Sequence, residues 1–182
     1  MKGAESIVRV SKFLGKKIVV KERIPKTYRT KELDMNLRKT RTKIEARLLN
    51  KAKKAGVVCP TVWCVEEYTL YLSFIKGKRP VMNEKNAQKA GIILAQLHHA
   101  DIIHGDYTPA NLILDTEMVV IDFGLGFFST DVEDKAIDVL TMRNAIATEE
   151  GKKAFLKGYS SYQNAPSILK RIKQVESRVR YF

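Results

Sequence analysis

Two neighbouring segments carry the strongest signal in this chain: His104-Gly105-Asp106-Tyr107-Thr108-Pro109-Ala110-Asn111 and Val120-Ile121-Asp122-Phe123-Gly124. Asp106 precedes Asn111 by five residues, and Asp122 follows eleven residues later, between an apolar run and a glycine. Oxygen ligands of this kind suit magnesium, which takes few ligands from a protein and the rest from water and phosphate. An aspartate that can receive a hydroxyl proton, then an asparagine and a second aspartate, indicate a site for phosphoryl transfer.

The composition is that of an ordinary globular protein, with 45% hydrophobic and 29% charged residues in a chain of 182. No apolar run approaches the roughly eighteen residues that cross a bilayer, and no signal-peptide pattern is present. We therefore expect no membrane association and a cytoplasmic location. The two cysteines, Cys59 and Cys64, are interpreted as thiols of a core or strand. A local disulfide or half a metal site is the alternative, but no second pair of ligands accompanies them.

The charge is distributed unevenly along the chain. Residues 1–60 carry 18 Lys or Arg and 5 Asp or Glu, residues 61–165 carry 10 and 14, and residues 166–182 carry 5 and 1. The basic surplus therefore lies at the two ends, and the phosphoryl-transfer motif lies in the acidic middle. Two interpretations stay open: solvated helix faces, or a surface that meets a polyanion such as RNA or an acidic partner.

The apolar pattern predicts strands in the first part of the chain and helices in the last part. Strands are expected at residues 7–10, 17–21, 57–65, 69–75, 112–114 and 118–121, with a turn near Gly15. Helices are expected at residues 41–55, 86–100, 134–147, 151–162 and 167–180. Residues 23–41 are polar, contain a proline and lack a steady period, which predicts a loop or an irregular helix. Residues 77–80 are predicted to link two lobes.

This layout predicts a reduced two-lobed protein-kinase-like fold of the α+β class. A single domain would occupy residues 1–182, with a small β-rich N-lobe at about 1–76. A truncated helical C-lobe would follow at about 77–182 and end in a basic amphipathic helix.

A kinase-like site also needs a strand lysine for the phosphates and a helix glutamate to pair with it. Lys21 ends an apolar run, and Glu45 lies inside the next predicted helix. The alternatives are a solvated lysine at a strand end and an exposed glutamate beside Arg41 and Lys43. A Gly-rich phosphate loop is nearly absent, since only Gly3-Ala4-Glu5-Ser6 precedes the first strand.

The chain resembles the atypical small kinase of the KEOPS complex, which is related to the RIO kinases. The resemblance covers nearly the whole chain and extends beyond the two motif segments. Its K-x-R-x-P-K-x-Y-R stretch is not a feature of kinases in general. The matching segments outside the motif are Gly3-Ala4-Glu5, Lys21-Glu22-Arg23-Ile24-Pro25-Lys26-Thr27-Tyr28-Arg29, Leu33-Asp34, Arg41-Thr42-Lys43-Ile44-Glu45-Ala46-Arg47-Leu48-Leu49 and Glu133-Asp134-Lys135-Ala136-Ile137-Asp138.

The resemblance implies binding of ATP and Mg²⁺, autophosphorylation on Ser or Thr, and ATPase activity inside KEOPS. That complex makes the threonylcarbamoyl modification of adenosine in tRNA on a neighbouring Kae-type subunit, so this subunit, other KEOPS subunits and tRNA are the implied partners. By this resemblance, the residues and their roles are Asp106 as catalytic base, Asn111 and Asp122 on the metal, Lys21 on phosphate, Glu45 as its ion-pair partner, Gly3, Ala4, Glu5 and Ser6 as a thin phosphate cradle, and Phe74 and Ile75 as the hinge that meets adenine. Asp138 is expected to brace the catalytic loop, with an ordinary acid near a helix N-terminus as the alternative.

The chain also departs from ordinary protein kinases. Gly105 stands where protein kinases commonly have an arginine that binds the phosphate of a phosphorylated activation loop. Only nine residues separate Gly124 from Asp134, and they contain no A-P-E element. We therefore expect neither an activation-loop phosphoswitch nor a docking groove for peptides.

The last predicted helix has an apolar stripe and a basic remainder. The stripe is Ile168, Leu169, Ile172, Val175 and Val179, and the basic residues are Lys170, Arg171, Lys173, Arg178 and Arg180. One interpretation is a helix docked on the C-lobe with a solvated basic face. The other, implied by the resemblance, is a tail that contacts tRNA or the partner subunit.

Two other functions remain open. A small-molecule phosphotransferase of the aminoglycoside or choline type shares H-G-D-x-x-x-x-N and I-D-F-G, but needs additional helices after Gly126. A nucleotide-sensing scaffold would bind ATP with little transfer, yet a pure scaffold has no need of Asp106.

Overall fold

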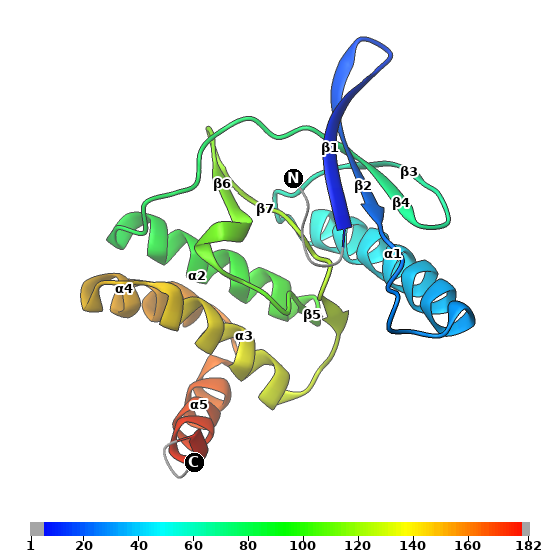
Figure 1. Ribbon diagram of the computed structural model, residues 1–182. Coiled ribbons are helices and arrows are strands. Elements are labelled where there is room, and N and C mark those ends of the chain that lie inside the picture. The colour runs from blue at the N-terminus through cyan, green and yellow to red at the C-terminus, as the bar shows by residue number, and fades with distance from the viewer. Residues whose placement is uncertain (1–5, 180–182) are drawn as a thin grey trace.

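The computed structural model describes residues 6–179 and shows an α+β arrangement of a small sheet lobe and a helical lobe (Figure 1). The sheet is antiparallel with the order β1-β2-β4-β3. Its strands are β1 (Ser6–Phe13), β2 (Lys16–Arg23), β3 (Val62–Val65) and β4 (Thr69–Ser73). Helix α1 (Lys31–Lys54) packs against this sheet (Figure 1).

The N-terminal hairpin forms as the sequence predicts. Phe13 pairs with Lys16, so Leu14 and Gly15 alone make the turn. Both have positive φ, 47° and 75°, which is the conformation of a type I′ turn and matches the twist of the strands. β2 is then central, paired with β1 on one side and β4 on the other.

Helix α1 begins ten residues earlier than its apolar pattern indicates. The prediction of a loop or irregular helix at residues 23–41 is therefore wrong from Lys31 onward. The face that α1 buries includes Asp34, Thr42 and Glu45 as well as leucines. Because polar residues interrupt the buried stripe, the sequence shows no regular apolar period there. The first three turns of α1 could therefore not be predicted from the apolar pattern.

The predicted strand at 57–65 is shorter in the structure, where β3 starts at Val62. Val57 and Cys59 are buried in the core, but Pro60 has no N–H to donate to a ladder. Both cysteines are free thiols, and burial raises the pKa of Cys59 to about 11. The thiol interpretation of the cysteines is confirmed.

The helical lobe contains α2 (Glu84–His99), α3 (Val132–Ala145), α4 (Glu149–Tyr159) and α5 (Ala165–Val179). α2 and α4 lie side by side at the left of Figure 1 and touch through glycines. A Cβ on Gly91 would lie 2.1 Å from the Phe155 carbonyl oxygen, and one on Gly158 would lie 2.0 Å from that of Gln88. Only glycine permits this approach.

Short elements between α2 and α3 carry the motif segments. They are β5 (Ile102–Ile103), the 3-10 turn η1 (Pro109–Asn111), β6 (Leu112–Leu114), β7 (Met118–Val120) and β8 (Phe127–Phe128). β5 pairs with β8 and β6 pairs with β7. The linker is held to this region, because Lys78 and Leu114 exchange two backbone hydrogen bonds of 3.1 and 2.8 Å.

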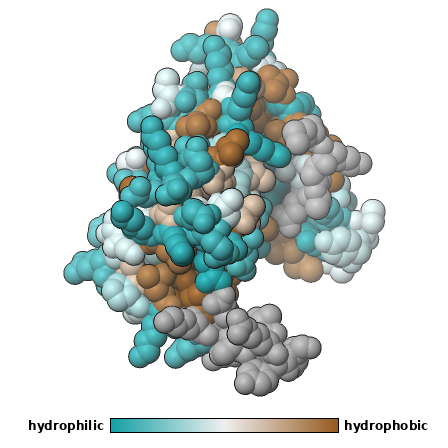
Figure 2. Space-filling model, turned by 90° about the vertical axis from the view of Figure 1, so that its left-hand side faces the viewer, coloured by the Kyte–Doolittle hydropathy of each residue, from teal (hydrophilic) through white to brown (hydrophobic). Residues whose placement is uncertain are grey.

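Hydrophilic side chains cover most of the face shown in Figure 2, with smaller apolar areas among them. Scattered apolar surface of this kind is normal for a globular protein. Across residues 6–179, no helix combines the length and the apolar composition that crossing a bilayer requires.

Candidate active site

A cleft of about 390 Å³ opens between the sheet, α1 and the β6–β7 region. Its lining is mainly apolar on the sheet side, from residues such as Val19 and Leu72. Polar groups enter it from separate parts of the chain. Of the residues predicted for the site, those that line the cleft are Ser6, Lys21, Glu45, Phe74, Ile75, Asn111 and Asp122.

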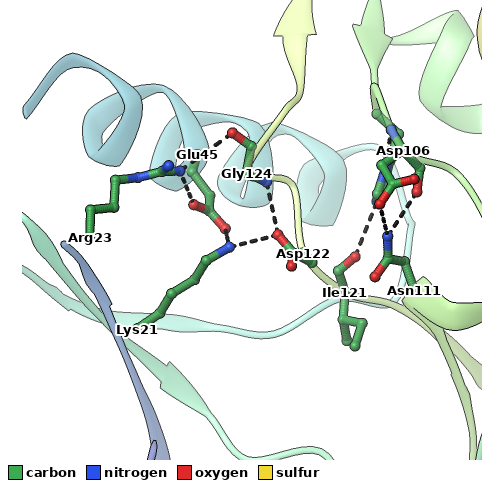
Figure 3. A network of polar contacts seen from close by, with 9 residues as sticks. Lys21, Arg23, Glu45, Asp106, Asn111, Ile121, Asp122 and Gly124 are labelled. Carbon is green, nitrogen blue, oxygen red and sulfur yellow. Dashed lines mark hydrogen bonds and ion pairs between the residues drawn. The ribbon is translucent and has the colours of Figure 1, made fainter. Parts of the chain in front are cut away.

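The Lys21 ammonium is held between two carboxylates (Figure 3). Its Nζ lies 2.6 Å from Glu45 Oε1 and 2.6 Å from Asp122 Oδ1. Burial opposes the charge on Lys21, but Glu45 and Asp122 outweigh it and raise the lysine pKa above its ordinary value. Burial likewise acts to raise the pKa of Asp122, and Lys21 outweighs burial and lowers it. Both shifts favour the charged forms of Lys21 and Asp122.

Arg23 is a part of the site that the sequence did not reveal. Its Nη2 donates to Glu45 Oε2 at 2.6 Å and lies 3.4 Å from the Gly124 carbonyl oxygen (Figure 3). Glu45 is thus shared by two buried cations. Lys21 and Arg23 are two residues apart on β2, so their side chains point to the same face. The signal that could have revealed Arg23 is its K-x-R spacing from Lys21 on a predicted strand, which puts both cations on the face of the sheet that meets the next helix.

Asp106 and Asn111 form a second polar group at the other side of the cleft (Figure 3). Asn111 Nδ2 donates to the Asp106 carbonyl oxygen and to its Oδ2, both at 2.8 Å. These two hydrogen bonds close a local loop that includes the η1 turn, and they require the five-residue separation of Asp106 and Asn111. Tyr107 anchors this loop in the core, where its hydroxyl donates to the Ala90 carbonyl at 2.9 Å.

His104 joins the two motif segments. Its Nε2 donates to the Ile121 carbonyl at 3.1 Å, and the Asp106 N–H donates to its Nδ1 at 3.3 Å. These partners require the neutral ring, and burial lowers the pKa of His104 in agreement with that. His104 therefore sets the separation between Asp106 and the strand that leads to Asp122.

Asp138 braces the loop that begins at His104, as the resemblance implies. Its carboxylate accepts the backbone N–H groups of His104 at 2.6 Å and Gly105 at 2.9 Å. His98 lies 3.4 Å from the same carboxylate and 2.7 Å from the Tyr159 hydroxyl. The alternative, an ordinary acid near a helix N-terminus, is wrong, because Asp138 is buried and both of its oxygens accept backbone N–H groups of residues 104 and 105.

The backbone around Asp122 is strained in a way that aims its carboxylate. Asp122 has φ 61°, a left-handed conformation that costs free energy for a residue with a side chain. The N–H of Gly124 donates to Asp122 Oδ1 at 3.2 Å and supports this turn. A Cβ on Gly124 would lie 2.9 Å from Asp122 Oδ1 and 3.1 Å from Lys21 Nζ, so glycine leaves room for the ion cluster.

The donor set fits a magnesium ion rather than a metal held only by protein. Among the described residues there is no group of three or more His, Cys, Asp or Glu that could hold a metal by itself. Asn111 uses its nitrogen for Asp106, and Asp122 uses Oδ1 for Lys21, so Asn111 Oδ1 and Asp122 Oδ2 are the atoms left to bind a cation. Two oxygen ligands are enough where phosphate and water complete the shell.

Other predicted residues fall outside this description. Gly3, Ala4 and Glu5 precede the described residues, and Arg180 follows them. The side chains of Lys173 and Arg178 are likewise outside the described part. On α5, Lys170 is exposed, while Arg171 is half-buried and pairs with Glu133 and Gln174. The predictions for the tail and the phosphate cradle therefore stay predictions.

The arrangement of lobes and site places this chain in the class of protein-kinase-like folds. The Rio2 kinase of Chaetomium thermophilum, in a complex with ADP, Mg²⁺ and phosphoaspartate, matches with a TM-score of 0.68 at 14% identity, over 100% of this chain and 69% of that one. A macrolide 2′-phosphotransferase of Brachybacterium faecium matches with a TM-score of 0.69 at 14% identity, over 93% and 80%. At such identities the likeness shows the fold alone.

Sequence comparison then identifies the family. The chain belongs to the RIO domain family, whose model matches residues 8–142. It is 41% identical over 172 residues to a probable serine/threonine-protein kinase BUD32 homolog of Archaeoglobus fulgidus, covering 90% of this chain and 88% of the relative. It is 42% identical over 193 residues to a probable bifunctional tRNA threonylcarbamoyladenosine biosynthesis protein of Methanobrevibacter smithii. That match covers 99% of this chain and 36% of the relative, so the chain spans about a third of the bifunctional protein.

Proposed function

We propose that this chain is an ATP- and Mg²⁺-dependent Ser/Thr protein phosphotransferase that works in a KEOPS-type assembly for threonylcarbamoyl modification of tRNA. The single observation that carries the proposal is the ion cluster of Lys21, Glu45 and Asp122, held across the cleft from the Asp106–Asn111 pair. Residues from four separate segments converge there, and each is of the type that phosphoryl transfer requires. In this proposal, residues 1–182 act as one domain with lobes divided near residues 76 and 77.

The proposed roles follow from the contacts. Lys21 binds nucleotide phosphate, and Glu45 holds its ammonium in the cleft. Asp106 receives the proton of the attacking hydroxyl, because Asn111 fixes its carboxylate without supplying a positive charge. Asn111 and Asp122 would hold Mg²⁺, which neutralises charge that develops on the phosphates.

The adenine would occupy the apolar part of the cleft. Val19 and Leu72 line it from the sheet, and Ile121 lines it from the motif segment. Phe74 and Ile75 follow β4 and line the cleft, which supports a role for their backbone in contacting the edge of the base. Ser6 is the described residue of the thin phosphate cradle that lines the cleft.

The assembly part of the proposal is supported by the names of the relatives. The bifunctional proteins continue well beyond the segment that matches this chain, which suits a chain that acts beside a Kae-type subunit. Autophosphorylation, ATP hydrolysis and a cytoplasmic location belong to the same proposal. So does contact of the α5 tail with tRNA, where exposed Lys170 offers a phosphate ligand.

The test is to incubate the pure protein with γ-labelled ATP and Mg²⁺, with and without the Kae-type subunit and tRNA. We expect Mg²⁺-dependent ADP release together with label on Ser or Thr of the protein. Nucleotide binding without ADP release and without label on protein would favour a nucleotide-sensing scaffold over an enzyme. Label on an added aminoglycoside or choline, and none on protein, would favour a small-molecule phosphotransferase.

A further inference from the structure

A second, smaller pocket lies outside the nucleotide cleft, between the segment that follows β2 and the first half of α1. In Figure 1 this segment curves beneath α1 on its way from β2 into the helix. The pocket has a volume of about 140 Å³, and none of its lining residues lines the larger cleft. Two apolar residues, Ile24 and Leu37, contribute to its wall. Its other lining residues are all cationic: Arg23, Lys26, Arg29, Arg38 and Arg41.

The cations around the pocket are held in place by other groups. Arg38 Nε donates to Asp34 Oδ2 at 2.7 Å, and the backbone N–H of Lys26 donates to Asp34 Oδ1 at 3.1 Å. The Arg38 guanidinium also lies 3.9 Å from the ring centroid of Tyr68. Asp34 is buried, and burial acts to raise its pKa, but Arg38, the backbone N–H of Lys26 and the charge of Arg29 outweigh burial and lower it. The pocket wall is therefore built in advance of any ligand.

Two carboxylates among the described residues lie against cations of the pocket. Asp34 lies against Arg38 and 3.8 Å from Arg29, and Glu45 lies against Arg23. Within residues 6–179, the guanidinium of Arg41 has no hydrogen-bond acceptor or ion-pair partner, although the residue is half-buried. Arg41 therefore adds a positive charge that no carboxylate among the described residues offsets, and clustering like charges in a partly desolvated place costs free energy.

We propose that this pocket binds a phosphate group. Arginine forks match tetrahedral oxyanions through paired, charge-assisted N–H donors, and a lysine adds a point charge. The volume is several times the roughly 30 Å³ share of one water, which leaves room for a tetrahedral oxyanion with water around it. Inorganic phosphate and a phosphate ester on a side chain or small molecule present the same group.

The pocket and the nucleotide cleft are linked by one side chain. Arg23 lines the pocket and donates to Glu45, which in turn holds Lys21. A phosphate in the pocket acts on the guanidinium that positions the glutamate of the cleft. The binding site itself does not require that the cleft turn over ATP, so its test is independent of the proposed function.

The test is a titration of ¹⁵N-labelled protein with inorganic phosphate, with sodium chloride adjusted to keep the ionic strength constant. We expect saturable amide shifts centred on Ile24 and Leu37. Arg41→Gln should weaken binding by about tenfold, the order of one lost charge-assisted contact. The matched control is Arg47→Gln, which removes the same charge from an exposed position of α1 and should leave the affinity within twofold. Lys26→Gln provides a second variant in case Arg41→Gln unfolds.

A parallel titration with O-phosphoserine identifies the source of the group. Tighter binding of the ester than of inorganic phosphate assigns the pocket to esters, and weaker binding assigns it to the free ion. The proposal is overturned if the shifts do not saturate, if they follow ionic strength instead of phosphate, or if they centre on cleft residues such as Val19, Leu72 and Ile121. Equal weakening by Arg41→Gln and Arg47→Gln would overturn it as well.

Discussion

The Arg23→Gln substitution tests the sharing of Glu45 by two buried cations. The side chains of Arg23 and Glu45 are 5% and 1% exposed, so their contact is screened little by solvent. Removing Arg23 leaves Lys21 as the one cation against both Glu45 and Asp122. It also removes the donor 3.4 Å from the Gly124 carbonyl oxygen. The cluster changes from two cations and two carboxylates to an excess of one negative charge.

The expected loss in the free energy of unfolding is about 3 kcal/mol. A hydrogen bond to a charged group contributes about 1.5–3 kcal/mol, and leaving a buried charge unpaired costs about 3–5 kcal/mol. The lower part of that range applies because Lys21 stays 2.6 Å from Glu45. For a chain of this size, about 2–4 °C of melting temperature accompanies each kcal/mol, so we expect a decrease of about 6–12 °C.

The assay is urea unfolding followed by far-ultraviolet circular dichroism, with a thermal scan as a second measure. Arg47→Gln is the control, because it removes an arginine that is exposed on α1. A double-mutant cycle with Glu45→Gln isolates the pair, and a coupling free energy of about 1 kcal/mol or more is expected. If Arg23→Gln stays within about 0.5 kcal/mol of the control, or if the two changes are additive, the shared-carboxylate reasoning is refuted.

Asp106→Ala should abolish ATP turnover while nucleotide affinity stays within twofold, since the base orients the nucleophile; equal loss of turnover and affinity would contradict that role. Asp122→Ala should weaken Mg²⁺-dependent nucleotide binding in a calorimetric titration, and an unchanged Mg²⁺ dependence would argue against it as a ligand. Gly158→Ala should destabilise the fold by about 1–3 kcal/mol or more, because its Cβ would lie 2.0 Å from the Gln88 carbonyl oxygen; unchanged urea unfolding would exclude the close contact. Burial lowers the pKa of His98 and His104, so below about pH 6.5 the unfolded chain binds protons that the folded protein does not. Stability is therefore full above that pH and should fall by up to about 2 kcal/mol between pH 6.5 and 5.5, with His99→Gln as the exposed control; a flat profile would refute neutral buried histidines.

The predictions that depended on local pattern came closest to the structure. The hairpin, the helix at α2 and the strands at β6 and β7 appear where the apolar periods place them, with ends shifted by a few residues. In these elements, apolar residues recur at the helical period or alternate with polar residues along a strand. The pattern is therefore visible within a short stretch of sequence. α1 differs because Asp34, Thr42 and Glu45 occupy its buried face. β5 and β8 are two residues long each, too short to show any period.

In the candidate site, too, the features set by local sequence could be predicted, and those set by tertiary contacts could not. The spacing of Asp106 and Asn111 is a property of six consecutive residues, and the turn that joins them is local. Arg23 escaped notice because nothing near it in sequence says which carboxylate it meets. The basic stretch from Lys21 to Arg29 was visible as composition, but its concave shape depends on α1 folding back over it.

The sequence alone determined the chemical kinds of group available and their order: an acid, an amide and a second acid in one short region, and a lysine and a glutamate far upstream. Tertiary structure decided which of them meet. Lys21 contacts Glu45 across 24 residues of sequence and Asp122 across 101, while Arg23 joins the same carboxylate. Ion pairs depend on distance and desolvation in space, and those are set only when the sheet, α1 and the motif segments pack together.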